Sequence, residues 1–176
     1  LGDDKIRNGI KVKVTDFPKR CEKSMLHKAK ASGNYLYSML ALKDALNSGY
    51  DEALILDVEN NVNEGSGENF FMVKENVLYT PKDQTVLNGI TRQTIMEIAV
   101  DLGFRVIEKD ISVDDVKNSD ESFFTGTAAE VTPIIQVDDT VISDGVPGSM
   151  TKNIQNEYFN LIRGKTLKYD HWLTRI

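Results

Sequence analysis

The sequence predicts an α/β fold of the α+β-like kind, in which helices flank one mixed β-sheet. Strand-like and helix-like segments alternate along the chain, and this alternation alone would indicate parallel strands joined by helices. A predicted hairpin interrupts the alternation, because the strand-like segments 69–74 and 77–79 are separated only by Glu75 and Asn76. A hairpin requires antiparallel neighbours, so we expect the sheet to be mixed rather than purely parallel.

The predicted elements of the first half follow from the spacing of apolar residues. Ile10, Val12 and Val14 alternate with lysines, as in a half-buried strand. Further on, apolar residues recur at helical spacing up to Gly49, which is a good C-terminal stop for a helix. In order, we expect a strand at 9–15, an irregular stretch at 16–32, a helix at 34–47, a strand at 52–58, a short strand or turn at 61–63, and the hairpin strands 69–74 and 77–79.

The second half repeats both patterns. Ile95, Ile98, Ala99 and Leu102 lie on one face of a predicted helix, and Gly103 follows as its stop. A short helix further on opens with acidic residues, which is favourable for its dipole. In order, we expect a helix at 92–102, a strand at 104–109, a short helix at 113–118, strands at 121–125, 131–137 and 140–143, a helix at 150–161, and a charged tail with a few aromatic residues.

Composition limits the class of protein. The 176 residues suit one domain with a sizeable core, and 40% hydrophobic with 27% charged residues is typical of a soluble globular chain. The net charge of −6 argues against nucleic acid or an anionic membrane as a partner. A single cysteine, Cys21, favours a reducing compartment such as the cytoplasm. No signal peptide or apolar span is present, and a start at Leu1 indicates a fragment or a processed product.

Metal chemistry and two common catalytic motifs are not indicated. His27 and His171 are the only histidines, and Cys21 has no partner cysteine, so we expect no metal site. Neither a Gly-x-Ser-x-Gly nucleophile elbow nor a Walker phosphate loop occurs.

Two short stretches carry the most specific chemistry: Lys-Ala-Ser-Gly-Asn-Tyr at 30–35 and Asn-Glu-Gly-Ser-Gly-Glu-Asn-Phe-Phe at 63–71. A lysine amine forms a Schiff base when desolvation or a nearby positive charge keeps it neutral. A carboxylate beside a pyridine nitrogen keeps that nitrogen protonated, as pyridoxal phosphate chemistry requires. Taken singly, Lys30 also fits a surface lysine near Lys23 and Lys28, and Glu64 fits a solvated turn residue.

Two further turns suit a phosphate group. Residues 88–91, Asn-Gly-Ile-Thr, lead into a predicted helix, whose backbone N–H groups and dipole favour an anion. Residues 126–129, Gly-Thr-Ala-Ala, follow a predicted strand and let backbone N–H groups approach closely. Each turn also fits an ordinary helix cap or a packed turn. Because a dianion needs several converging donors, we expect Thr91 and Thr127 to lie close together.

From about Gly9 to Gly164, these segments in this order resemble the large domain of the branched-chain amino acid aminotransferases, which are fold-type IV pyridoxal phosphate enzymes. The resemblance implies a mixed-sheet pseudo-barrel flanked by helices. It makes 9–176 the cofactor-binding domain and 1–8 a remnant of an interdomain connection, with the family's small N-terminal domain absent from this chain. It further implies amino transfer between branched-chain amino acids and 2-oxoglutarate in amino-acid biosynthesis, by a homodimer or a larger homo-oligomer.

The same resemblance implies roles for individual residues. Lys30 would form the Schiff base with pyridoxal 5'-phosphate and move the substrate proton. Tyr35 would hydrogen-bond the phenolic oxygen of the cofactor and Glu64 its pyridine nitrogen, whereas Glu68 would not touch the cofactor. The remaining contacts would be Leu87 on the ring, the N–H groups of Ile90 and Thr91 and the hydroxyls of Thr91 and Thr127 on the phosphate, and the N–H groups of Ala128 and Ala129 on the substrate carboxylate.

Two other interpretations compete with this one. D-amino acid aminotransferases and aminodeoxychorismate lyases share the fold, but usually differ around the positions of Gly33-Asn34-Tyr35 and Gly67-Glu68-Asn69. A chain without the small domain could also be inactive, binding cofactor weakly or only pairing with a partner chain.

Overall fold

The strands form one nine-stranded mixed sheet in the computed structural model, which describes residues 2–17, 28–84 and 86–174. The strand order is β3-β2-β1-β8-β7-β4-β5-β6, and β9 pairs with β8. The mixed sheet predicted from the sequence is confirmed, because β1 lies parallel to β2 and β8 whereas β7 lies antiparallel to β4 and β8. The strands are β1 Ile10–Val14, β2 Glu52–Leu56, β3 Val62–Glu64, β4 Asn69–Lys74, β5 Val77–Thr80, β6 Arg105–Glu108, β7 Glu121–Gly126, β8 Glu130–Val137 and β9 Thr140–Val141.

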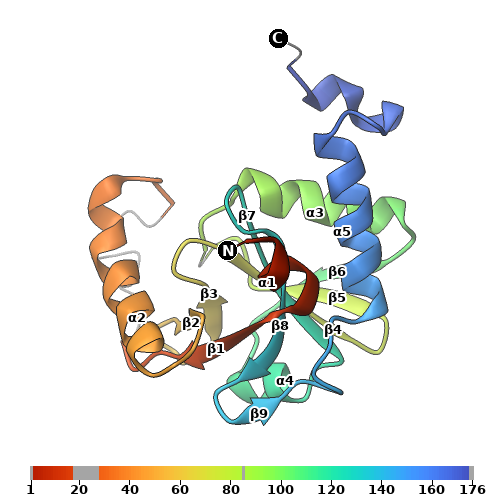
Figure 1. The fold of residues 1–176 in the computed structure, drawn as a ribbon. Helices are drawn as coiled ribbons and strands as arrows, with labels where there is room; N and C mark the ends of the chain where they lie inside the picture. The colour runs from red at the N-terminus through yellow and green to blue at the C-terminus, as the bar shows by residue number, and fades with distance from the viewer. Residues whose placement is uncertain (1, 18–27, 85, 175–176) are drawn as a thin grey trace.

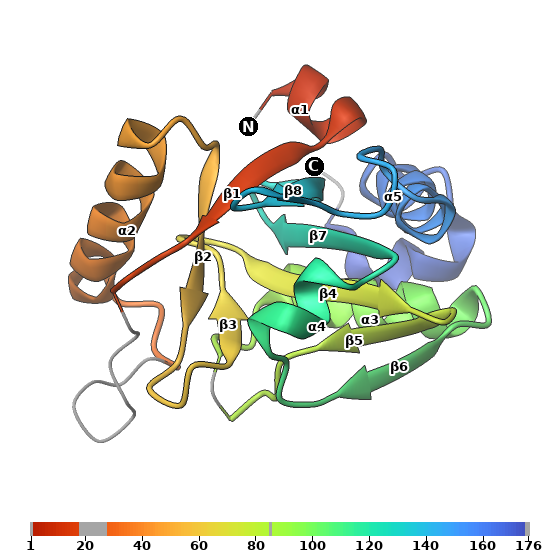
Figure 2. The ribbon, with the colours of Figure 1, turned by 90° about the horizontal axis from the view of Figure 1, so that it is seen from below.

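The sheet closes on itself. β3 pairs with β2 on one side and with β4 on the other, so β3, β2, β1, β8, β7 and β4 form a barrel-like ring. Glu64 lies opposite Asn69 where β3 meets β4. β5 and β6 extend the sheet beyond β4 (Figure 2). This arrangement matches the pseudo-barrel expected from the resemblance.

Alternation along the strands separates two hydrophobic clusters. Phe70 and Phe124 meet edge to face with centroids 6.1 Å apart, in the cluster that fills the ring. Their neighbours Phe71 and Phe123 point to the opposite face and stack at 5.1 Å. Successive strand residues face opposite sides, so the two consecutive phenylalanines of each strand supply both clusters.

Helices cover the outside of the ring (Figure 1). The helices α3 (Ile90–Asp101) and α5 (Ser149–Ile162) pack on the face that carries Phe71 and Phe123. The helix α2 (Tyr35–Asn47) lies on the other side, against β2. The shorter helices are α1 Asp3–Asn8 and α4 Val113–Lys117, with 3-10 turns at Ser32–Asn34 and Leu167–Trp172.

The predicted elements occur within two residues of their expected positions, and two strands that end early do so for local reasons. The strand expected at 52–58 ends at Leu56, because the Asp57 carboxylate accepts the N–H groups of Glu59 and Asn61 and forms a turn. The strand expected at 140–143 ends at Val141, before Ser143, which has a φ of 50°. Residues expected to be only a connection form α1.

Three residues considered in the sequence, Cys21, Lys23 and His27, lie outside the described part of the chain. Within that part, no helix is long and apolar enough to cross a bilayer, and no cluster of histidine, cysteine or acidic side chains could hold a metal ion.

Candidate active site

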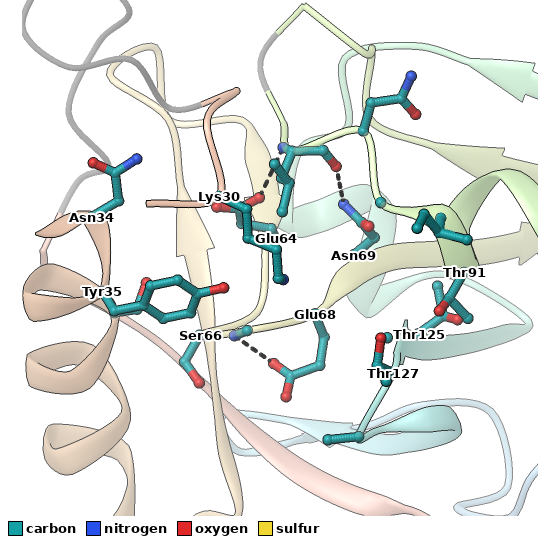
Figure 3. A pocket seen from close by; sticks show the side chains of 18 of the residues that line it. Lys30, Asn34, Tyr35, Glu64, Ser66, Glu68, Asn69, Thr91, Thr125 and Thr127 are labelled. Carbon is teal, nitrogen blue, oxygen red and sulfur yellow. Dashed lines mark hydrogen bonds between the residues drawn. The ribbon is translucent and has the colours of Figure 1, made fainter. Parts of the chain in front are cut away.

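A cavity of about 390 Å³ opens where β3, β4 and β7 begin or end. It brings together residues from four distant parts of the sequence (Figure 3). The residues singled out in the sequence that line it are Lys30, Tyr35, Glu64, Leu87, Ile90, Thr91, Thr127 and Ala128. Ala129 is not among the lining residues, and its side chain is 2% exposed. That the backbone N–H of Ala129 binds the substrate carboxylate stays a prediction.

Lys30 and Tyr35 reach the cavity from the two ends of a tight turn. The 3-10 turn Ser32–Asn34 runs directly into α2, of which Tyr35 is the first residue. The Asn34 side chain donates to the Ala29 carbonyl at 2.9 Å and holds the turn together. The Lys30 Nζ consequently lies 5.8 Å from the centroid of the Tyr35 ring. Both side chains project into the cavity that Glu64 faces (Figure 3).

Glu64 and Asn69 hold one backbone segment between them. They are cross-strand partners at the closure of the ring, and residues 65–68 form the turn that joins them. The Leu87 N–H donates to Glu64 Oε2 at 3.3 Å, and Asn69 Nδ2 donates to the Leu87 carbonyl at 2.8 Å. A Cβ on Gly89 would lie 2.4 Å from Asn69 Oδ1, so this close approach requires glycine. The pair therefore fixes Leu87 and the start of α3 beside the cavity.

The two turns that suit an anion meet at this cavity, as the sequence predicts. Gly89 precedes α3 and provides no side-chain cap, so the first N–H groups of the helix, at Ile90 and Thr91, are available to an anion. Thr127 lies opposite them, after β7. The Thr125 hydroxyl donates to the Glu130 carbonyl at 2.8 Å and holds the turn that carries Thr127. Figure 3 shows Thr91, Thr125 and Thr127 close together.

Acidic side chains dominate the electrostatics of the cavity. Burial raises the pKa of Glu68 to about 7, and the negative charges of Glu52 and Glu64 add to the effect, against a hydrogen bond from the Gly67 N–H. Burial also raises the pKa of Glu52, which is 3% exposed and accepts the N–H groups of Ala53 and Ser66. Glu68 lines the cavity as Glu64 does. That Glu64 rather than Glu68 contacts the cofactor stays a prediction.

Some site residues carry no signal in the sequence. Tyr37 lines the cavity, and the hydroxyl of Tyr158 from α5 forms a hydrogen bond with Thr91. Both look like core aromatics of amphipathic helices when read in one dimension. Only the packing of α2 on β2 and of α5 on α3 brings them to the site.

The arrangement can do two things chemically. The Lys30 amine, the Glu64 carboxylate and the Tyr35 hydroxyl line one cavity, together with the helix start at Ile90 and the turn at Thr127 that suit an anion. These groups suit covalent capture of an aldehyde that carries a phosphate, together with proton transfer at the captured molecule.

Known proteins are similar to this chain in sequence and in fold. The family model for amino-transferase class IV matches residues 3–137. The branched-chain-amino-acid aminotransferase of Pseudomonas aeruginosa is 46% identical over 176 residues, which are 100% of this chain and 57% of that protein. The Escherichia coli (strain K12) enzyme of the same name is 39% identical over 177 residues, with 100% and 57% covered.

Solved structures agree with the sequence matches. A T.th. branched-chain amino acid aminotransferase with pyridoxamine 5'-phosphate superposes with a TM-score of 0.95 at 39% identity, covering 99% of this chain and 57% of that one. An E. coli branched-chain amino acid aminotransferase gives a TM-score of 0.96 at 39% identity, covering 99% and 58%. This chain thus spans under three fifths of the length of these relatives. Because the family model covers most of its residues, the chain belongs to the class IV aminotransferases.

Proposed function

We propose that this chain is the cofactor-binding part of a pyridoxal phosphate-dependent aminotransferase that moves an amino group between branched-chain amino acids and 2-oxoglutarate. The observation that carries the proposal is the cavity in which Lys30, Glu64 and the turn at Thr127 converge. The T.th. enzyme has been solved with N-(5'-phosphopyridoxyl)-L-glutamate and with 4-methylvaleric acid. Those ligands combine the cofactor with glutamate and supply a branched aliphatic acid, which supports the substrate pair.

The residues present fit the cofactor. A cavity of about 390 Å³ lies in the ordinary range for small-molecule sites. The start of α3 has no side-chain cap, so its N–H groups can bind a phosphate. The buried Tyr37 hydroxyl has no hydrogen-bond partner in the described chain, which is typical of a group that a ligand or ligand-bound residue completes.

The cofactor, when bound, supplies an aldehyde carbon and a ring that accepts electrons from the substrate. Lys30 would hold the cofactor aldehyde through its amine. Once the amino group of the substrate has taken its place, the freed Lys30 amine would accept the proton from the substrate α-carbon. Glu64 would hold a proton at the ring nitrogen, and Tyr35 would donate to the phenolic oxygen. Ile90, Thr91 and Thr127 would bind the phosphate, Leu87 would pack on the ring, and the N–H groups of Ala128 and Ala129 would receive the substrate carboxylate.

The proposed enzyme acts on small-molecule amino and 2-oxo acids as a homodimer or larger homo-oligomer in the cytoplasm. The single cysteine supports a reducing compartment. The net charge of −6 argues against a nucleic-acid partner.

Covalent labelling tests the site. The chain is mixed with pyridoxal phosphate, reduced with borohydride and mapped by peptide mass. We expect the pyridoxyl group on Lys30 and its loss in Lys30→Ala, because Lys30 lines the cavity. Lys43→Ala is the matched control, since Lys43 is an exposed lysine of the adjoining helix. A pyridoxyl group on Lys28 in place of Lys30 would contradict the assignment.

Substrate assays test the reaction. We expect amino transfer from leucine to 2-oxoglutarate to exceed transfer from D-alanine, and we expect no conversion of aminodeoxychorismate. The labelling experiment and this assay test different parts of the proposal, namely cofactor attachment and amino transfer. A chain that is labelled at Lys30 but transfers no amino group would be a binding fragment, as the competing interpretation holds.

A further inference from the structure

Tyr37 is a cavity-lining residue whose polar atom has no partner in the described chain. Its ring packs with the cluster that includes Ala53 and Ile55, between α2 and β2. Its hydroxyl oxygen is buried and makes no hydrogen bond. Burying a hydroxyl unpaired is costly, so a native protein rarely keeps one without use.

Glu64 is the acceptor that the geometry favours. β2 pairs with β3 so that Ile55, a member of the cluster on which Tyr37 packs, lies opposite Glu64. Both Tyr37 and Glu64 line the cavity. Burial raises the pKa of the Tyr37 phenol, and the negative charge of Glu64 raises it further. A carboxylate has about four lone-pair positions, so Glu64 can accept from Leu87, from Tyr37 and from a ring nitrogen together.

We propose that Tyr37 is a positioning residue whose hydroxyl donates a hydrogen bond to the Glu64 carboxylate when the cofactor site is filled, and so orients that carboxylate toward the ring nitrogen. This inference rests on the proposed function and deepens it. Tyr37 follows Lys30 through one 3-10 turn and the first turn of α2. Covalent attachment at Lys30 therefore fixes the segment that carries Tyr37.

A double-mutant cycle tests the bond in the 176-residue chain. The variants are Tyr37→Phe, Glu64→Gln and the pair together, and the readouts are the dissociation constant of pyridoxal phosphate and the absorbance band of the bound cofactor. Tyr37→Phe keeps the ring and its packing. Glu64→Gln keeps the shape and removes the charge that strengthens the bond. Tyr50→Phe is the matched control, because Tyr50 packs on the same cluster without lining the cavity.

We expect Tyr37→Phe to weaken pyridoxal phosphate binding about tenfold when Glu64 is intact, and less than about twofold when Glu64→Gln is already present. The absorbance band should shift in Tyr37→Phe, because the proton on the cofactor ring is held differently. Tyr50→Phe should leave both readouts unchanged.

Two results would overturn the inference about Tyr37 and leave the proposed function standing. One is a loss of affinity of the same size in both backgrounds, which would mean that Tyr37 acts by packing or by touching the cofactor itself. The other is an unchanged affinity in Tyr37→Phe. If the unsubstituted chain neither binds pyridoxal phosphate nor becomes labelled at Lys30, the proposed function fails and the inference fails with it.

Discussion

At the scale of single residues, Glu68 makes stability depend on pH. Its pKa is about 7 in the folded chain against an ordinary 4.5, so the folded chain binds more protons than the unfolded chain between these values. The free energy of unfolding should therefore fall as pH rises through this window. We expect Glu68→Gln to remove about 1–2 kcal/mol of that fall, after allowance for solvent screening.

Urea denaturation at about pH 5 and about pH 8 measures the effect. Glu52, whose pKa burial also raises, should keep part of the slope in the variant. The control is Glu59→Gln, in an exposed turn, which should leave the slope unchanged. A slope as steep in Glu68→Gln as in the unsubstituted chain would contradict the assignment.

Cavity residues that lie in a short local motif could be found in the sequence. Residues that meet the cavity or its lining only through the packing of helices could not. Lys30 and Glu64 sit in glycine-bearing stretches whose backbone shape follows from local spacing. Tyr37 lines the cavity and Tyr158 hydrogen-bonds to the cavity residue Thr91 only because α2 packs on β2 and α5 packs on α3. Apolar spacing does not reveal which group a tyrosine hydroxyl will meet.

At the scale of elements, α5 begins against a carboxylate from a neighbouring strand. Glu121 Oε1 accepts the Met150 N–H at 3.0 Å, and Glu121 Oε2 accepts the Thr151 N–H at 2.7 Å. Gly148 provides no cap of its own, and a Cβ there would lie 2.0 Å from Glu121 Cδ. Glu121 therefore caps α5 from a distance in sequence and complements its dipole.

We expect Glu121→Gln to lower the free energy of unfolding by about 1–2 kcal/mol, because it removes a charged cap. Gly148→Ala should cost a similar amount, since it displaces the same carboxylate. Guanidinium denaturation measures both, and Glu97→Gln on the exposed face of α3 should change stability by less than about 0.5 kcal/mol. A loss no greater than that of the control would show that Glu121 is not the cap.

The helix α2 shows why element type was easier to predict than element packing. Its apolar spacing correctly predicts a helix, yet Leu36, Met39, Leu40 and Leu46 are 49–69% exposed, and the residues buried against β2 are Ala41 and Ala45. Periodicity measures how apolar residues are spaced, not which of them a given sheet can accommodate.

At the scale of the whole molecule, the two turns that suit an anion, at residues 88–91 and 126–129, come from distant parts of the chain and meet only in the folded domain. Binding of an anion by the folded state alone should stabilise the whole domain. We expect inorganic phosphate, but not chloride at equal ionic strength, to raise the melting temperature by a few degrees. Thr127→Val should reduce that rise, whereas Thr140→Val, on β9 and outside the cavity lining, should not. An equal rise in both variants would mean that phosphate binds elsewhere.

The ring itself could be predicted from the sequence only by resemblance. The hairpin at 69–79 could be predicted from the spacing of its two strands and the two residues between them. In the structure those two residues, Glu75 and Asn76, both have positive φ, as a tight hairpin turn requires. The pairing of β1 with β8 joins Ile10 to Ile134, and nothing in the spacing of either strand identifies its partner.

The central place of β1 also bears on how the chain reaches its folded state. β1 lies between β2 and β8, so it gains its second partner only after residues 130–137 are available. Closing so long a loop costs chain entropy before any pairing offsets it, which slows folding. We expect the β4–β5 hairpin and the β7–β8 pair to form first and β1 to dock late. The segment carrying Lys30 follows β1, so the cavity would be assembled in one of the last steps of folding, after most of the hydrophobic core exists.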